Sequence, residues 1–245
     1  MTNTTFEAGS AHASAPPMSL VSRFIGIITS PKATFESVAA HPRWLGMIAV
    51  TTLIIALGVS APLTTEGGKQ SQLDQQVKFM EGFGMQIGDQ QYAAMQQGMG
   101  RAAISSFIFT LIGGPIWSVI VAGILFGVFA VMGGQARFKQ LFAVYVHSGV
   151  VMAASQLFLG PLNYFRQSMS SATNLGVFNT GAEGSFLARF LGMIDLFVIW
   201  WVVVLAIGLA VLYKRRTQPI AITLFSIYGV IIIVFASIMS MFGRS

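Results

Sequence analysis

Asp195 is the residue whose setting most needs a chemical explanation, because it is the only acid in any of the long apolar runs. An ionised aspartate deep in a membrane-spanning helix costs roughly 2.5–3.5 kcal/mol, so it must face protein or water, or be protonated. His147 and Gln156, in another apolar run, are the other candidates for intramembrane chemistry. From the helical rise, His147 and Asp195 differ in depth by only about 6 Å, which makes His147 the best partner.

These polar residues have two interpretations. In the functional one, Asp195 and His147 form a proton or ion relay, or a switch between two packings of the bundle. In the structural one, Asp195 is a hydrogen-bonded lock, or lies close enough to the outer interface to stay hydrated. We favour the structural interpretation, and Ser148, Gln156 and Asn163 are further neutral partners for Asp195.

The sequence offers no residue set for catalysis. It has no cysteine, and its three histidines (His12, His41 and His147) lack a paired metal-ligand spacing. His147-Ser148-Gly149 is the wrong arrangement for a serine protease, and an aspartyl site needs two membrane acids. Neither a P-loop nor a Gly-rich dinucleotide turn occurs. We therefore expect a non-enzymatic protein with no metal and no cofactor.

The composition is that of a polytopic membrane protein. Apolar residues make up 54% of the chain and charged residues 9%, whereas soluble domains carry about 25% charged residues. The net charge is +6, but the basic residues lie beside apolar runs. That placement is typical of membrane orientation and argues against nucleic-acid binding.

Five apolar stretches can cross a hydrocarbon core of roughly 30 Å, which predicts an all-α bundle of five transmembrane helices. They cover residues 44–63, 103–132, 140–164, 187–213 and 219–242. The second stretch is too long for one upright helix. We expect a break or kink in it at Gly113, Gly114 and Pro115.

Glycines indicate where the spans pack against one another. Gly123 and Gly127 form a G-x-x-x-G pair that lets another helix approach closely, most commonly within the same bundle. Gly192 belongs to a stripe of small residues around Asp195, and Gly208 is a further packing position.

The N-terminal part divides into two pieces. Residues 1–18 are predicted to be a disordered cytoplasmic tail, and residues 19–245 form a single membrane domain. Within residues 19–41, Leu20, Phe24, Ile27 and Ile28 make an apolar face that excludes Arg23, and Ser30-Pro31 restarts the helix. We expect this amphipathic unit to lie at the headgroup level. A cytoplasmic helix packed on the bundle is the alternative.

Two polar segments lie between the spans. Residues 64–101 predict two short amphipathic helices over the outer face of the bundle, since apolar residues recur there at helical spacing. Residues 166–183 are rich in serine, asparagine and glycine and predict a loop.

Basic residues set the expected orientation. Arg43 and Trp44 mark the inner interface of the first span, and Lys214, Arg215 and Arg216 form a short basic turn before the fifth. Because cytoplasmic loops carry an excess of Lys and Arg, we expect a cytoplasmic N-terminus and an outer C-terminus.

Three stretches resemble the bacterial branch of the Yip (Ypt-interacting protein) domain family. The pattern Asp195-x-Phe197-x-x-Trp200, then Gly208 and the basic turn, is similar to the family's fourth span. Residues 24–44, with Ser30-Pro31, Phe35 and Pro42, resemble its opening, and residues 142–148 resemble its third span. The likeness covers roughly residues 19–241.

The resemblance implies a five-helix integral membrane protein with an inward N-terminus, located in the bacterial inner membrane. Eukaryotic members are linked to vesicle traffic and to Rab/Ypt GTPases, but this chain lacks their Asp-Leu-Tyr-Gly-Pro type motif. We expect an adaptor or accessory subunit for trafficking or export machinery, or for membrane organisation. Its expected partners are the lipid bilayer, other membrane proteins and further copies of itself in a homo-oligomer. The alternative is a small transporter or channel subunit that uses an Asp195/His147 relay.

Overall fold

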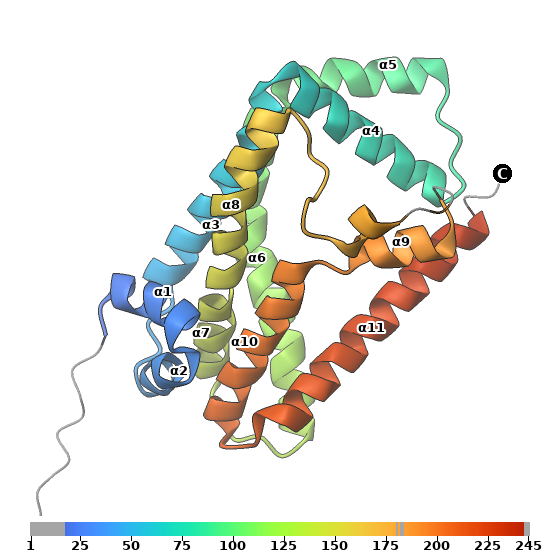
Figure 1. Cartoon of the computed structure of the whole chain (residues 1–245). Helices are drawn as coiled ribbons and strands as arrows, with labels where there is room; N and C mark the ends of the chain where they lie inside the picture. Colours follow the sequence, from blue (N-terminus) through green and yellow to red (C-terminus); the bar gives the residue numbers. More distant parts are fainter. Residues whose placement is uncertain (1–17, 180, 182–183, 243–245) are drawn as a thin grey trace, which may run out of the picture.

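The chain folds into helices arranged as five spans with short helices at both ends (Figure 1). The computed structural model describes residues 18–179, 181 and 184–242, so the predicted tail at 1–18 falls almost wholly outside the described residues. The described part contains five helices long and apolar enough to cross a membrane, which confirms the predicted fold class. The spans are built from α3 (Leu45–Ser60), α6 (Ala102–Val131), α7 with α8 (Phe138–Ser148 and Val150–Arg166), α10 (Leu196–Tyr213) and α11 (Thr217–Phe242).

Two short helices, α1 (Leu20–Thr29) and α2 (Pro31–Ala40), precede the first span. The Ser19 side chain accepts a hydrogen bond from the amide of Ser22 and so caps α1, and Pro31 begins α2. Helix α2 packs against α7 and α10, where the Phe35 side chain is fully buried. This contact brings the N-terminal region into the hydrophobic core.

The core lies where α2, α7 and α10 meet, and its closest approach is at Gly208. A Cβ placed there would lie 2.6 Å from Cγ1 of Val144 and 2.9 Å from the ring of Phe35. Leu141 and Leu209 complete this contact, and both are fully buried. Only glycine lets α10 come this near to its neighbours.

A second close contact joins α3 to α8. A Cβ on Gly160 would lie 2.9 Å from Cα of Gly58, and a Cβ on Gly58 would lie 2.7 Å from Cβ of Gln156. Backbone meets backbone here, which is the usual role of small residues between membrane helices.

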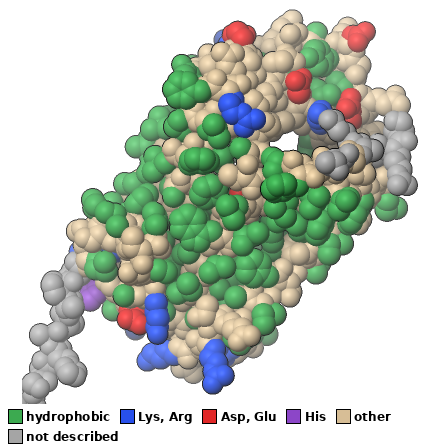
Figure 2. All heavy atoms as spheres, in the orientation of Figure 1, with side chains coloured by type: hydrophobic (Ala, Val, Ile, Leu, Met, Phe, Trp, Pro, Cys, Tyr) green, Lys and Arg blue, Asp and Glu red, His purple; other side chains and the backbone are tan. Residues whose placement is uncertain are grey.

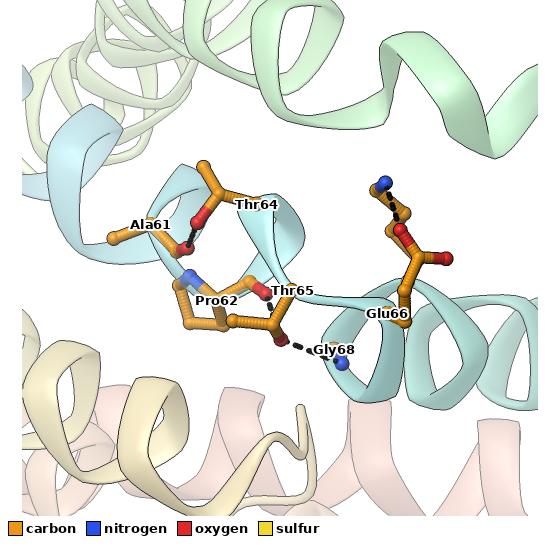
Figure 3. Close-up of polar contacts among 7 residues, drawn as sticks. Ala61, Pro62, Thr64, Thr65, Glu66 and Gly68 are labelled. Carbon is orange, nitrogen blue, oxygen red and sulfur yellow. Dashed lines mark hydrogen bonds and ion pairs between the residues drawn. The ribbon is translucent and has the colours of Figure 1, made fainter.

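The first span ends in a tight polar turn, shown in Figure 3. The short 3-10 helix η1 (Pro62–Thr64) follows α3, and the Thr65 hydroxyl donates to the carbonyl of Pro62 at 2.8 Å. The same hydroxyl oxygen accepts from the amide of Gly68 at 3.0 Å and caps the next helix. The chain thereby leaves the span and turns into the outer layer.

The outer layer consists of α4 (Glu66–Gly82), α5 (Asp89–Gly98) and α9 (Phe186–Met193), which lie across the ends of the spans (Figure 1). Arg189 of α9 donates to the carbonyl of Met239 at 2.5 Å and to that of Gly82 at 3.4 Å. These carbonyls belong to the last turns of α11 and α4. Carbonyls in the last turn of a helix have no hydrogen-bond partner within that helix. One arginine thus ties three helices together.

Helices α6 and α11 lie at the edge of the bundle. Helix α6 packs on α3 and α7, whereas α11 packs on α10 and α9 and diverges from α10 toward its C-terminus (Figure 1). Helix α6 continues through Pro115, so the chain is not broken at Gly113, Gly114 and Pro115, and the kink expected there stays a prediction. A proline removes only one hydrogen bond of the helix, and the flanking apolar turns remain intact.

The molecular surface has the banding of a membrane protein. Figure 2 shows hydrophobic side chains over a broad band of this face. Lys and Arg cluster at the end that carries the α10–α11 turn, whereas the α4–α5 end carries most of the visible Asp and Glu together with further Lys and Arg.

Candidate functional site

Asp195 does not lie inside a helix. The predicted span at 187–213 is two helices, α9 and α10, and Asp195 occupies the extended break between them with φ −111° and ψ 138°. One carboxylate oxygen accepts from the amide of Phe197 at 2.8 Å, which makes Asp195 the N-cap of α10. The other oxygen accepts from the hydroxyls of Thr173 at 2.6 Å and Ser171 at 3.0 Å.

The break is held open by backbone pairing with the loop that contains Thr173. The amide of Leu175 donates to the carbonyl of Ile194 at 2.9 Å, and the amide of Leu196 donates to that of Thr173 at 3.1 Å. From α11, the Tyr228 hydroxyl donates to the carbonyl of Met193 at 2.5 Å. The carbonyls of Met193 and Ile194 and the amide of Leu196, freed by the break, are therefore satisfied by protein.

The break changes the expected position of Asp195. Helix α10 has 18 residues. Its length is about 27 Å, enough to cross most of a hydrocarbon core of about 30 Å by itself. Asp195 therefore lies at the end of this span. Its contacts are those of a structural cap.

His147 has a different set of partners. Its side chain is fully buried, its Nδ1 lies 2.7 Å from the carbonyl oxygen of Ala143, and its Nε2 lies 3.0 Å from Nη1 of Arg23. Arginine has only donors, so Nε2 must accept. Nδ1 then carries the proton and donates to Ala143. The geometry assigns His147 as a neutral imidazole, and within the described residues no hydrogen bond joins it to Asp195.

Arg23 is buried, contrary to its predicted place on the polar side of the first helix. The same Nη1 donates to the carbonyl of Arg43 at 2.6 Å, so one guanidinium links α1, α7 and the start of α3. Burial first, and then the positive charge of Arg43, lower the pKa of Arg23. Arginine nevertheless stays protonated in proteins. Ile28, which belongs to the predicted apolar face, is exposed together with Val21 and Ile25.

Ser148 lies beside His147 but is committed to structural bonds. Its hydroxyl donates to the carbonyl of Tyr145 at 2.7 Å and accepts from Nε1 of Trp201 at 3.1 Å. The Trp201 ring also meets Tyr145 edge-on, with centroids 6.1 Å apart. Trp201 thus faces the bundle rather than the lipid.

Gln156 lines a cavity of about 360 Å³ between α3, α6, α7, α8 and α10. The cavity also contains the neutral polar side chains of Thr52, Thr110, Trp117 and Tyr145. None of these five side chains hydrogen bonds to another residue in the described part of the chain. Thr52 is 8% exposed, and its hydroxyl has no hydrogen-bond partner in the described residues. The cavity is therefore lined by hydrogen-bond donors and acceptors that have no partner in the described part of the chain, and it lies between the membrane-spanning helices.

The other glycine positions behave differently from one another. A Cβ on Gly123 or Gly127 would meet nothing within 4 Å, so this pair does not pack within the bundle as expected. Gly192 also has open space at its own Cβ position, although its backbone lies against Gly176. Gly208 and the pair Gly58 and Gly160, in contrast, are among the glycines that make close contacts between helices.

The interfacial residues are partly engaged. Trp44 packs edge-on against Phe142, with ring centroids 5.0 Å apart, and Arg43 contributes its backbone carbonyl to Arg23. Lys214 ends α10 in the left-handed conformation with φ 52°. Arg215 and Arg216 follow it and are exposed.

Sequence reasoning did not identify Arg23, Thr173, Ser171, Arg189 or the Gly58–Gly160 contact. Arg23, Arg189 and Gly58 each contact a residue far away in the chain. Ser171 and Thr173 contact Asp195, which lies 24 and 22 residues further along. Across the described residues, no group of three or more His, Cys, Asp or Glu side chains could hold a metal ion.

Comparison with known proteins agrees with this architecture. The family model of the Yip1 domain matches residues 25–239, a range that includes the first four spans and most of the fifth. A search of the curated proteins found no match, and a search of the solved structures found none either. The family match covers most of the chain and confirms the resemblance read from the sequence. The chain belongs to the Yip1 domain family of membrane proteins.

Proposed function

We propose that this Yip1-domain protein is a non-enzymatic adaptor or accessory subunit that binds other integral membrane proteins within the bilayer. It would serve trafficking or export machinery, or membrane organisation. The observation that carries the proposal is the cavity of unpartnered neutral polar side chains at α6, defined by Thr52, Thr110, Trp117, Tyr145 and Gln156.

The physical reason is the cost of leaving such groups unpaired. Water does not reach the hydrocarbon region, so an unsatisfied polar group there costs several kcal/mol. A helix from another membrane protein can supply the missing partners, since Ser, Thr, Asn and Gln side chains hydrogen bond between membrane helices. The absence of any Asp, Glu, Lys or Arg from the residues lining the cavity favours a neutral polar partner.

A different face of α6, which does not line the cavity, suits the same role. Gly123 and Gly127 lie there, exposed and with nothing within 4 Å of a Cβ. A second helix can approach the backbone closely at such a pair. A partner with more than one span would pack one helix on the glycines and hydrogen bond at the cavity with another.

The orientation that we propose has the N-terminus in the cytoplasm and the C-terminus outside, in the inner membrane of a bacterium. It rests on the basic α10–α11 turn, whose three consecutive cations lie at Lys214, Arg215 and Arg216. The exposed side chains of Val21, Ile25 and Ile28 follow one face of α1. We propose that this face enters the headgroup region of the inner leaflet.

Site-specific photo-crosslinking in the native host tests the adaptor function. A benzophenone amino acid replaces Ile120 on α6, and the matched control position is Ile233 on α11; these side chains are 47% and 48% exposed. We expect a defined membrane-protein adduct from position 120 only. Gln156→Leu should weaken it about 3- to 30-fold, because an interhelical hydrogen bond is worth about 0.6–2 kcal/mol.

Two results would contradict the proposal. One is the same adduct pattern at both positions, which would mean random collision in the membrane. The other is the absence of any adduct from position 120, together with solute flux through liposomes that contain only the purified protein. Mass spectrometry of the adduct separates a second copy of this chain from a different protein.

A further inference from the structure

A second cavity opens between α6, α10 and α11, on the side of the bundle where α11 diverges. It has a volume of about 380 Å³, and most of the side chains that line it are apolar. Representative lining residues are Val128, Leu205, Leu224, Ile227 and Ile231. We call this cavity the α6–α11 groove.

One end of the α6–α11 groove is positively charged. Arg215 and Arg216 line it there, next to Pro219 in the first turn of α11. Nη2 of Arg215 donates to the carbonyl of Met132 at 2.9 Å, which holds the arginine against the end of α6. Arg216 forms no hydrogen bond or ion pair with any residue that the structure describes. Most donors of the two guanidinium groups are therefore available to a ligand.

The length of the groove matches one membrane leaflet. It extends along α11 from Pro219 to Ile231. Twelve residues of helix rise about 18 Å, slightly more than half of a hydrocarbon core of about 30 Å. A transmembrane helix of a partner would need a contact face through both leaflets. A lipid needs a site for its headgroup and a channel through one leaflet.

We infer that the α6–α11 groove binds an anionic phospholipid, with its phosphate on Arg215 and Arg216 and an acyl chain along the groove. Guanidinium groups bind phosphate oxygens in pairs, and these bonds are stronger than those between neutral groups. This site is separate from the α6 face proposed for protein partners. It is a defined lipid site, distinct from the general attraction of basic loops to anionic membranes.

Native mass spectrometry of the full-length protein in detergent tests the headgroup site. The protein is mixed with phosphatidylglycerol or with phosphatidylcholine. We expect one retained phosphatidylglycerol and at least tenfold less phosphatidylcholine. Arg215→Gln with Arg216→Gln should lower phosphatidylglycerol retention about tenfold or more, the loss expected for charge-assisted hydrogen bonds. The matched control is Lys139→Gln, an exposed cation of the other short basic turn that does not line the groove.

A second pair of variants tests the acyl-chain channel without changing any charge. Val128→Trp fills the groove, whereas Val131→Trp lies one turn further along the same helix, is 91% exposed and does not line the groove. We expect lipid loss only from Val128→Trp. Both variants are compared after far-UV circular dichroism has shown the wild-type helix content, and a variant that unfolds is replaced by Val128→Phe.

Several outcomes would overturn the inference. Equal retention of the two lipids, or an equal loss with Lys139→Gln, would reduce the effect to nonspecific electrostatics. Displacement by inorganic phosphate with no effect of Val128→Trp would indicate a phosphate site without a lipid chain. A second protein chain found in the groove by crosslinking from position 227 would replace the lipid as its occupant.

Discussion

Replacing Arg23 by methionine tests the buried contact that joins α1 to the bundle. The substitution removes the donor to Nε2 of His147 at 3.0 Å and to the carbonyl of Arg43 at 2.6 Å. Each buried acceptor left without a donor costs about 1–3 kcal/mol. Arg23 is 7% exposed, so some water can reach the vacated position. We expect a loss of about 2–4 kcal/mol in the free energy of unfolding.

A double-mutant cycle isolates the contact with His147. His147→Leu removes one acceptor and leaves the bond from Arg23 to the Arg43 carbonyl. Because a hydrogen bond to a charged group is worth about 1.5–3 kcal/mol, we expect the double variant to be less destabilised than the sum by about that amount. Arg43→Met is the control, since its side chain is exposed and the carbonyl remains. Its expected effect is within about 0.5 kcal/mol.

The assay is unfolding of the purified protein in mild detergent by added sodium dodecyl sulfate, followed by far-UV circular dichroism and tryptophan fluorescence. Additive effects of Arg23→Met and His147→Leu, within about 0.5 kcal/mol, would refute the contact. Nitrogen-15 NMR of labelled histidine is an independent check. A proton on Nε2 of His147 would refute the assigned tautomer, because a protonated nitrogen cannot accept from arginine.

Three further predictions are tested by the same unfolding assay or by amide hydrogen exchange, which reports on local unfolding. Gly160→Ala should destabilise the protein by about 1–3 kcal/mol, since the new Cβ meets Cα of Gly58 at 2.9 Å. Gly123→Ala should leave the stability of the protein unchanged or raise it by up to about 1 kcal/mol, because the new Cβ has no atom within 4 Å. Equal effects of Gly160→Ala and Gly123→Ala would contradict this packing. Asp195→Ala should cost about 1–2 kcal/mol through loss of the helix cap and its two hydroxyl donors; an unchanged midpoint would mean that the cap is unimportant. Arg189→Met should raise amide hydrogen exchange in the last turn of α11 while leaving α7 unchanged, and unaltered exchange in α11 would rule out its capping role.

The five spans could be predicted because each needs a long apolar run, and hydropathy reports this directly. Hydropathy did not reveal the break between α9 and α10 at Asp195. Residues 187–213 are almost continuously apolar, although α9 lies across the end of the bundle and α10 runs along it. A signal was present: an aspartate directly before an apolar run, which is typical of a helix N-cap. Weighting that signal would have placed Asp195 at a helix start.

The partner of His147 could not be predicted from spacing. Arg23 is 124 residues away in the chain, on a helix too short to count as a span. Its helical face was judged by hydrophobicity, which assigns an arginine to the solvent side. In the fold, the face of α1 that carries Arg23 meets α7, and the apolar side chains of Val21 and Ile25 point outward. In a membrane protein the outside is also apolar, so amphipathic patterning does not distinguish the inner face from the lipid face.

The glycines show the same ambiguity. Gly123 and Gly127 stand out because they are four residues apart on one helix, yet their face is empty in the monomer. Gly58 and Gly160 lie on different helices and meet only after folding. Spacing within one helix identifies a smooth face. It does not identify what packs on that face.

Some of the residues described above hold the chain's own helices together, and others have no hydrogen-bond partner within the described part of the chain. The two groups should respond differently to substitution. The Gly208 contact, the Arg23–His147 bond and the Asp195 cap all connect helices within the chain, so their loss should reduce the amount of folded protein and partner binding together. Gln156 and Arg216 have no hydrogen-bond partner in the described residues, so their replacement removes no bond within the protein. Their variants should therefore stay folded and lose only binding. If Gln156→Leu and Arg216→Gln instead unfold the protein as readily as Arg23→Met, these residues belong to the structural core and neither surface is a binding site.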